Sequence, residues 1–235
     1  MIFVTGTDTG CGKTTVGRAL CAALRRRGLS VAAFKPVETG CAEVGGRRVA
    51  ADAEALARAA GCFSEITPAL LCPIRLAMPA SPERAAAAER LDPLDLGVIA
   101  AAWDQARRAA DFVVVEGAGG LLVPINATAT MADVASRLGL PVLVVARDEL
   151  GTVNHTLLTV EAARARGLRV AGVVFSSPSA GPGAGSLDNA RAVAAHGRVE
   201  VLGALPHLPG ADDSTLANAA EATLDLDAIL RTSRP

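Results

Sequence analysis

Three glycines, a lysine and several hydroxyl side chains follow a short apolar segment at the start of the chain. The segment Ile2–Thr5 runs into Gly6-Thr-Asp-Thr-Gly-Cys-Gly-Lys-Thr-Thr15. Glycines let backbone N–H groups turn inward, and a helix beginning near Lys13 adds the positive end of its dipole. A lysine there reaches the outer phosphates of a nucleotide, and the Thr14 hydroxyl can bind Mg²⁺. The pattern predicts a phosphate site, although five residues rather than the usual four separate Gly6 from Gly12; an ordinary glycine-rich turn is the alternative.

Two more charged side chains are predicted at the same edge of a sheet. Glu116 follows the apolar run Phe112–Val115, and Lys35 follows Val31–Phe34. Ligands of α/β proteins bind at the carboxyl ends of parallel strands, so Glu116 could hold Mg²⁺ directly or through water. Lys35 could neutralise charge that develops during phosphoryl transfer. Taken singly, the alternatives are a turn-capping carboxylate and an ordinary surface lysine.

Short apolar runs alternate with longer helical stretches along the chain. The runs are rich in valine, and glycines end several of the helical stretches. The expected strands are Ile2–Thr5, Val31–Phe34, Phe112–Val115, Val142–Ala146, Val170–Phe175 and Val199–Leu202, and the expected helices are Lys13–Arg27, Ala51–Ala60, Leu94–Ala110 and Thr152–Arg166. This alternation predicts an α/β fold with a mostly parallel sheet, helices on both faces, and one domain over residues 1–235. The glycine- and proline-rich segment 178–186 is expected to be a mobile loop.

The composition excludes several classes of function. The chain has 235 residues, 51% hydrophobic and 20% charged, and its net charge of -1 gives no global attraction to nucleic acid or an anionic membrane. Its five cysteines form no C-x-x-C pair, which argues against a disulfide framework or a zinc site. No apolar run approaches the ~20 residues of a membrane span, and the amino terminus lacks a signal-peptide pattern. We expect a cytoplasmic protein that binds neither nucleic acid nor membrane.

Five motifs resemble, in order, those of the ATP-dependent dethiobiotin synthetase family. They are G-T-D-T-G-C-G-K-T-T, K-P-V-E-T-G, V-E-G-A-G-G-L-L-V-P, Leu150-Gly-Thr-Val-Asn-His155 and Gly203-Ala-Leu-Pro-His-Leu208, and they span nearly the whole chain. The five-residue spacing in the first motif is also that of the family. The resemblance implies a single-domain P-loop NTPase and a homodimeric ligase of biotin biosynthesis that uses ATP and Mg²⁺. The implied substrates are 7,8-diaminopelargonate and CO₂ or bicarbonate, joined through a carbamate and a carbamic–phosphoric anhydride to give dethiobiotin, ADP and phosphate.

The resemblance also implies roles for individual residues. Lys13 and Lys35 are the implied catalytic lysines, and Lys35 would contact the carbamate and the transferred phosphoryl group. Nucleotide or metal contacts are implied for Gly10, Cys11, Gly12, Lys13, Thr14, Thr15, Asp52, Glu116, Gly117, Ala118, Gly119, Ser176, Pro206, His207 and Leu208, with Thr14, Asp52 and Glu116 on Mg²⁺. Substrate contacts are implied for Thr9, Lys35, Thr39, Gly151, Thr152, Val153 and Asn154, the last four at a helix start that reaches across the dimer interface.

The sequence departs from the family at three places that bear on recognition, of which one is Ser81-Pro82-Glu83, at a wall of the implied substrate pocket, where the family often has His after Ser-Pro. Ser176-Ser177 stand where many relatives have Asn-Asp to read adenine, so the choice of nucleobase is left open. Thr39 stands where serine is common, and either hydroxyl can donate one hydrogen bond.

Three other functions fit parts of the pattern. A partitioning-type switch ATPase has a related fold and loop, but its signature lysine would fall at Asp8, and a carboxylate there cannot stabilise phosphates. An amide-forming synthase of cobalamin metabolism would need a glutaminase domain for which 235 residues leave no room. A catalytically dead nucleotide-binding module is disfavoured, because the charged residues needed for catalysis are all present.

Overall fold

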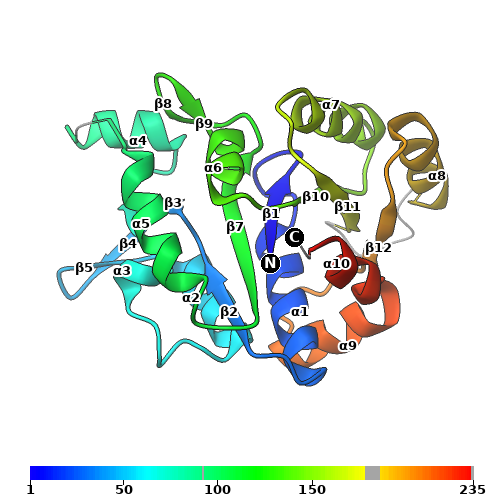
Figure 1. Cartoon of the computed structure of the whole chain (residues 1–235), viewed down its shortest axis with the longest axis horizontal. Helices are drawn as coiled ribbons and strands as arrows, with labels where there is room; N and C mark the ends of the chain where they lie inside the picture. The colour runs from blue at the N-terminus through cyan, green and yellow to red at the C-terminus, as the bar shows by residue number, and fades with distance from the viewer. Residues whose placement is uncertain (92, 178–185, 234–235) are drawn as a thin grey trace.

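The central feature of the fold is a six-stranded sheet in which all neighbouring strands are parallel (Figure 1). The computed structural model describes residues 1–91, 93–177 and 186–233. The strands are β1 (Ile2–Gly6), β2 (Val31–Phe34), β7 (Phe112–Gly120), β10 (Val142–Arg147), β11 (Val170–Ser176) and β12 (Val201–Leu205). Their order is β12-β11-β10-β1-β7-β2. Because β1, β7 and β2 are neighbours, the segments that follow their carboxyl ends lie side by side.

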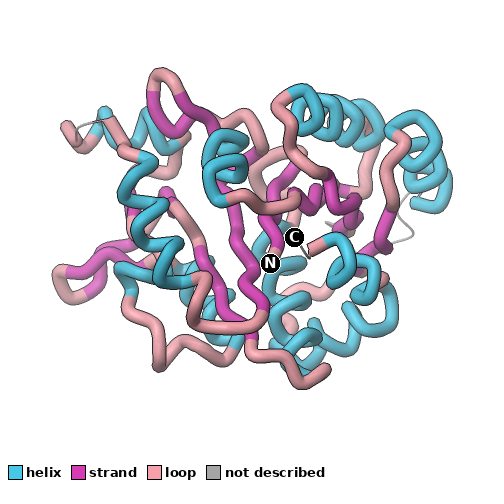
Figure 2. The backbone as a smooth tube through the Cα atoms, in the orientation of Figure 1, coloured by secondary structure: helices cyan, strands magenta, loops and turns pink. Residues whose placement is uncertain are grey.

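Helices cover both faces of this sheet (Figures 1 and 2). The larger ones are α1 (Lys13–Arg26), α2 (Ala51–Ala60), α5 (Leu96–Ala106), α6 (Met131–Leu138), α7 (Thr152–Ala165), α8 (Ser186–Gly197), α9 (Asp213–Thr223) and α10 (Leu226–Thr232). α1 packs against both α2 and α9, while α7 packs against α8 and β10. Every residue of β1 and β2 is buried, which explains why these strands are continuously apolar instead of alternating.

Several short elements beside the main sheet were not predicted. They are β3 (Val37–Thr39) paired with β6 (Ile74–Leu76), the hairpin of β4 (Ala42–Val44) and β5 (Arg47–Val49), the hairpin of β8 (Pro124–Asn126) and β9 (Ala129–Thr130), and the helices α3 (Pro68–Leu71) and α4 (Pro82–Ala88). None is long enough to show a period in the sequence. The hairpin of β4 and β5 turns at Gly45 and Gly46, which both have positive φ values.

Most of the predicted elements are confirmed, but some boundaries were wrong. The strand expected at Val199–Leu202 is β12, which begins two residues later and continues to Leu205. The helix expected at Leu94–Ala110 is α5, which is shorter at both ends. It starts later because the Asp95 side chain accepts a hydrogen bond from the N–H of Gly97 (2.7 Å) and so caps the helix. The helices expected to end at Arg27 and Arg166 each end one residue earlier.

The strand that begins at Phe112 is longer than predicted. β7 continues through Glu116 to Gly120, and Gly120 pairs with Gly6 at the end of β1. This extension places the glycines after Glu116 directly beside the loop that follows β1. The expected mobile loop at 178–186 lies outside the described residues except for Ser186, where α8 begins.

Two predictions concern features of the whole chain. All five cysteines, which the sequence predicts to form no disulfide framework, are buried free thiols. Among the described residues, no helix is both long and apolar enough to cross a membrane.

Candidate functional site

The loop between β1 and α1 has a conformation that depends on its glycines. Gly10 and Gly12 have φ values of 71° and 97°, in the region that favours glycine. A Cβ atom on Gly12 would also lie 2.2 Å from the Oγ of Ser176. The carbonyl of Gly12 accepts a hydrogen bond from the N–H of Val16 (2.9 Å), so α1 begins directly after the loop. The first turn of α1 therefore presents free N–H groups at the place where the sequence predicts a phosphate site.

Lys13 is buried in this loop. Its Nζ donates to the carbonyl oxygen of Asp8 at 3.0 Å and lies 3.9 Å from the Sγ of Cys11. The Asp8 carboxylate accepts a hydrogen bond from the N–H of Thr9 (2.6 Å). Asp8 stands where a switch ATPase would carry its signature lysine, and here both its carboxylate and its carbonyl help to shape the loop.

A group of opposite charges joins α1, β2, α2 and β7; Lys35 and Glu116 are buried in it, and Asp52 lies at its exposed edge. Lys35, which follows β2, pairs through Nζ with Oδ2 of Asp52 at 3.1 Å and with Oε1 of Glu116. Glu116 Oε1 also accepts a hydrogen bond from the Thr14 hydroxyl (3.0 Å). Burial alone lowers the pKa of Lys35, but the carboxylates of Glu116 and Asp52 more than offset it and raise that pKa above its ordinary value. Lys35 is therefore a cation at neutral pH and cannot act as a general base.

Glu38 is a site residue that the sequence reasoning missed. Its Oε1 accepts from the N–H of Asp52 at 3.0 Å and its Oε2 from the N–H of Ala53 at 2.9 Å. Helix α2 has no capping side chain of its own, because its N-cap residue is Ala50. Glu38 supplies the missing acceptors from β3 and so fixes the turn that carries Asp52. Burial raises the pKa of Glu38. An alanine before a helix, with a carboxylate in the preceding motif, was the signal available in the sequence.

Substitution Glu38→Ala is expected to lower the free energy of unfolding by about 1–3 kcal/mol, because two N–H groups of α2 lose their acceptor. Glu38→Gln keeps one carbonyl oxygen and should lose less. Urea denaturation of the two variants measures the difference. If both variants unfold at the parent's urea midpoint, Glu38 does not cap α2.

These groups line a cavity of about 400 Å³ at the carboxyl ends of β1, β2 and β7. The lining residues are Thr9, Gly10, Gly12, Lys13, Thr14, Thr15, Lys35, Glu38, Thr39, Asp52, Glu116, Gly117, Ala118 and Gly119. All of them except Glu38 are residues predicted from the sequence. The chain has two lysines, Lys13 and Lys35, and both line this cavity.

Other predicted residues lie outside the lining of this cavity. Cys11 is buried within the loop, and Ser176 lies against Gly12 at the end of β11. Pro206, His207 and Leu208 follow β12, whose last carbonyl, at Leu205, accepts a hydrogen bond from the N–H of Ser177 (3.1 Å). Gly151, Thr152, Val153 and Asn154 form the start of α7. One copy of the chain therefore does not bring these last four residues to the cavity.

A second cavity adjoins the phosphate loop on the side of α7. It has a volume of about 430 Å³, and Thr9 lines both cavities. Its other walls include the segment 120–124 and residues His155, Leu158, Thr159 and Ala162 of α7. Leu122 and Leu158, on these two segments, and Leu150, just before α7, are exposed large apolar side chains. An apolar surface thus lies next to the charged cavity.

The residues around Glu116 fit a magnesium ion bound together with phosphate. Mg²⁺ usually takes one or two carboxylates and keeps water or phosphate oxygens as its other ligands. Oε2 of Glu116 is buried and has no hydrogen-bond partner in the described part of the chain. The Thr14 hydroxyl contacts its other oxygen, and Asp52 is joined to it through Lys35. No cluster of three or more His, Cys, Asp or Glu side chains suited to a metal occurs among the described residues.

Comparison with solved structures bears on the fold. A chain of the MinC:MinD cell division protein complex of Aquifex aeolicus is similar with a TM-score of 0.58 and 13% identity, over 100% of this chain and 97% of that one. A ParA family ATPase from Chlorobium tepidum TLS is similar with a TM-score of 0.52 and 11% identity, over 99% and 93%. At these identities the likeness concerns the fold alone, and it agrees with the predicted α/β class, a mostly parallel sheet with helices on both faces.

Comparison of sequences identifies the family. A family model described as an AAA domain matches residues 1–215. A protein of Anaeromyxobacter dehalogenans strain 2CP-C, named ATP-dependent dethiobiotin synthetase BioD, is 51% identical over 175 residues, which are 74% of this chain and 75% of the relative. A protein of the same name from Anaeromyxobacter sp. strain K is 50% identical over the same shares. The chain therefore belongs to the ATP-dependent dethiobiotin synthetase family of ligases.

Proposed function

We propose that this chain closes the ring of dethiobiotin from 7,8-diaminopelargonate and CO₂ with ATP. The observation that carries the proposal is the convergence of Lys13, Lys35, Thr14, Asp52 and Glu116 on one cavity. Such a set of cations and oxygen ligands matches a reaction in which several anions must lie close together. The names of the relatives supply the substrate class.

The reaction has three bond-forming steps. One amine of the substrate attacks CO₂ and loses a proton, which gives a carbamate. A carbamate oxygen then attacks the γ-phosphorus of ATP, and the bond to the β-phosphate oxygen breaks to release ADP. The second amine attacks the carbamoyl carbon of the resulting anhydride and loses a proton, the bond from that carbon to the phosphate oxygen breaks, and the cyclic urea and phosphate form.

Lys35 acts in this scheme as a fixed positive charge. Because Lys35 stays protonated, it stabilises the carbamate and the transferred phosphoryl group and takes no proton from an amine. Lys13 holds the outer phosphates, and Gly10, Cys11, Gly12 and Thr15 surround them as parts of the loop and first turn. Gly117, Ala118 and Gly119 pass beside the loop without bulky side chains and leave room for the nucleotide.

Mg²⁺ would be held by Thr14, Asp52 and Glu116, where it would neutralise charge on the β- and γ-phosphates. We expect Thr14→Val to raise the Mg²⁺ concentration needed for half-maximal ring closure by about tenfold, since one hydroxyl ligand is lost. Thr14→Ser, which keeps the hydroxyl, is the matched control. Rates measured against Mg²⁺ at saturating ATP test this, and equal Mg²⁺ dependence in both variants and the parent would contradict the role of Thr14.

In this proposal the diamine and the nucleobase bind at different places: the diamine near Lys35, and the base near the ends of β11 and β12. Thr9 and Thr39 would bind the diamine on the side of Lys35. In a homodimer, Gly151, Thr152, Val153 and Asn154 of the second copy would bind the distal carboxylate through the free N–H groups of their helix. Exposed Leu122, Leu150 and Leu158 support an interface beside the cavity. Ser176, Pro206, His207 and Leu208 follow or end β11 and β12, where they would contact the base and ribose.

The proposed reaction is tested by incubating the protein with 7,8-diaminopelargonate, bicarbonate and MgATP. Mass spectrometry should find the cyclic urea, and a phosphate assay should find one phosphate for each ring formed. ATP hydrolysis that does not depend on the diamine and yields no ring would instead favour the partitioning-type switch ATPase.

A further inference from the structure

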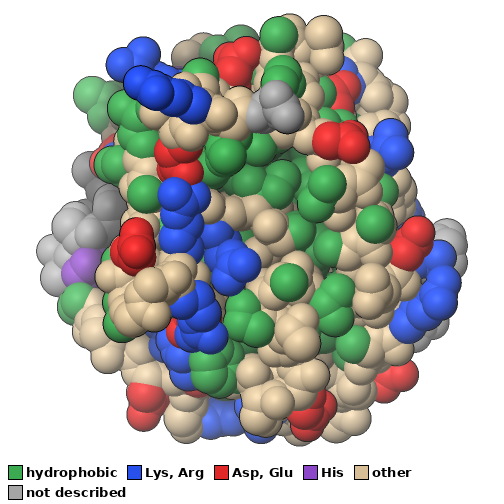
Figure 3. Space-filling view, turned by 90° about the vertical axis from the view of Figure 1, so that its left-hand side faces the viewer, with side chains coloured by type: hydrophobic (Ala, Val, Ile, Leu, Met, Phe, Trp, Pro, Cys, Tyr) green, Lys and Arg blue, Asp and Glu red, His purple; other side chains and the backbone are tan. Residues whose placement is uncertain are grey.

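A separate cavity lies outside the site described above, between the hairpin of β4 and β5, helix α2 and helix α3. It has a volume of about 290 Å³, at the small end of the range for ligand sites. Its lining residues are Arg47, Arg48, Ala50, Glu54, Phe63, Ile66, Pro68, Leu71, Cys72 and Arg75, and none of them lines the nucleotide cavity. Figure 3 shows that basic side chains gather on the face of the molecule that carries this hairpin. The cavity is thus an independent candidate site.

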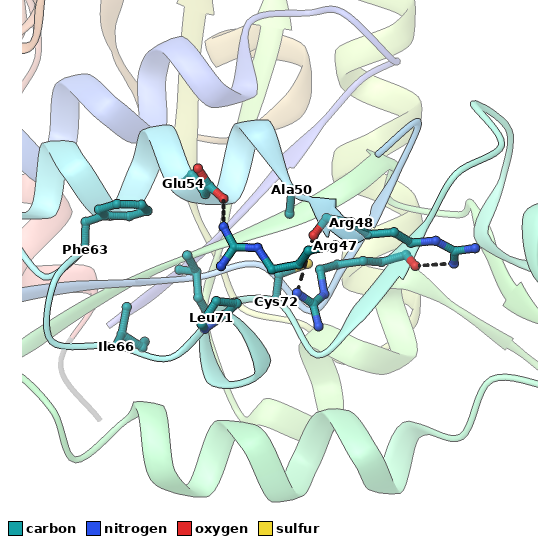
Figure 4. A pocket seen from close by; sticks show the side chains of 10 residues that line it. Arg47, Arg48, Ala50, Glu54, Phe63, Ile66, Leu71 and Cys72 are labelled. Carbon is teal, nitrogen blue, oxygen red and sulfur yellow. Dashed lines mark hydrogen bonds and ion pairs between the residues drawn. The ribbon is translucent and has the colours of Figure 1, made fainter. Parts of the chain in front are cut away.

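The cavity has more positive than negative side chains around it. Glu54 pairs with both Arg47 (3.8 Å) and Arg58 (3.4 Å). Arg48 pairs with Glu89 at 2.5 Å. Figure 4 shows Arg47 turned toward Glu54 across the mouth of the cavity.

Within the described part of the chain, Arg75 is the arginine of this lining that has no carboxylate partner. Among the described residues no Asp or Glu lies within ion-pair distance of Arg75, and its guanidinium donates one long hydrogen bond, to the carbonyl of Arg48 (3.5 Å). A guanidinium presents several donors in a planar fork that matches a carboxylate. A monoanion bound at Arg75 would therefore give this guanidinium the carboxylate partner that it lacks in the described part of the chain.

The rest of the lining is apolar. Phe63 and Ile66 form the wall opposite the arginines, and Leu71 and Cys72 form part of the floor (Figure 4). The ring of Phe63 is held by the Arg58 guanidinium, which lies 4.8 Å from the ring centroid. Burial raises the pKa of the Cys72 thiol, and its Sγ donates to the carbonyl of Ile74 (3.3 Å), so this cysteine is a packed apolar group and not a nucleophile.

The floor and rim of the cavity are bonded to the nucleotide site. The carbonyl oxygen of Leu71 accepts a hydrogen bond from the backbone N–H of Lys35 (2.9 Å). Ala50 on the rim is the N-cap of α2, the helix that carries Asp52. A molecule bound here would contact the backbone that holds both partners of the Lys35–Asp52 ion pair.

We propose that this cavity binds a small monocarboxylate with an apolar chain. Arg75 holds the carboxylate, with Arg47 beside it, and the chain packs against Phe63, Ile66 and Leu71. The binding does not depend on the reaction proposed above, because the two cavities share no lining residue.

Isothermal titration calorimetry of the full chain with sodium hexanoate, in the absence of ATP and diamine, tests this site. Hexanamide, which has the same chain and no charge, and inorganic phosphate, which has charge and no chain, are the comparison probes. Hexanoate should bind at least tenfold more tightly than either. Equal binding of inorganic phosphate, or no heat with hexanoate up to about 10 mM, would overturn the proposal.

Two variants locate the binding. Arg75→Gln removes the charge, and Ile66→Glu introduces a carboxylate that competes for Arg75; each should weaken hexanoate binding at least tenfold. Arg137→Gln, at an exposed arginine of α6, is the matched control and should bind like the parent. If hexanoate binding persists unchanged in both cavity variants, the anion binds elsewhere. If the parent protein proved unable to close the ring, the hexanoate binding results would still test this site, because they do not depend on that reaction.

Discussion

Lys35→Gln should lower the rate of ring closure by about 10³-fold, the loss seen when one preorganised donor to a developing charge is removed. The amide keeps a polar group on a slightly shorter side chain but removes the charge. Lys35 is the buried cation that pairs with Asp52 and Glu116, and its raised pKa keeps it protonated. Initial rates of dethiobiotin formation at saturating ATP and diamine measure the effect. A rate within tenfold of the parent would remove Lys35 from the mechanism.

The same substitution also affects stability, which requires a control. Without Lys35, the carboxylate of Glu116 is left buried without its counter-charge, and this costs free energy of unfolding. The double variant Lys35→Gln with Glu116→Gln removes both charges and should recover much of the stability without recovering ring closure. Urea denaturation beside the rate assay separates the two effects.

The raised pKa of Lys35 also predicts how the protein responds to alkali. The ion pair stabilises the folded chain fully below the unfolded pKa of about 10.4, and this contribution is lost as pH rises through the still higher folded value. Lys35 should therefore show no titration between pH 7 and 9. The chain has two lysines, so NMR with lysine labelled at Cε gives two assignable signals. A titration of the Lys35 signal near neutrality would contradict its role as a fixed charge.

Lys13→Gln should weaken ATP binding by about 10²-fold, because a buried charge-assisted contact to the phosphates is lost. The Lys13 ammonium is held in the loop by the carbonyl of Asp8 and lines the nucleotide cavity. Equilibrium dialysis with MgATP measures the dissociation constant. AMP, which lacks the outer phosphates, serves as the matched ligand, and its binding should change much less. If the substitution weakens AMP and ATP binding equally, Lys13 does not contact the outer phosphates.

The parts of the site that the sequence predicted depend on local geometry. A strand, a glycine loop and a helix are consecutive in the chain, so the position of Lys13 follows from the order of residues. Glu116 and Lys35 each follow an apolar strand, and parallel pairing then brings them to one edge. Their direct ion pair could not be predicted, because it depends on β7 lying next to β2 in the sheet order.

The parts that the sequence did not predict depend on pairing between distant segments. Glu38 caps a helix that begins 13 residues later in the sequence, and no motif within α2 indicates this contact. The extension of β7 to Gly120 depends on the pairing of Gly120 with Gly6. The local valine-rich pattern predicts only the first part of this strand and gives no information on that pairing. Arg75 and Arg48 meet because β5 and β6 lie side by side, and their cavity has no sequence signature.

The central claim is that this site transfers the γ-phosphate of ATP to a carbamate oxygen. A single-turnover reaction with ¹⁸O-labelled CO₂, in unlabelled water, tests it most directly. The carbamate oxygen that attacks phosphorus stays with the phosphate when the ring closes, so each phosphate released should carry one ¹⁸O atom and the ring carbonyl should carry another. Phosphate that contains no label while the ring forms would show that ATP is hydrolysed by water, and the proposed mechanism would be wrong.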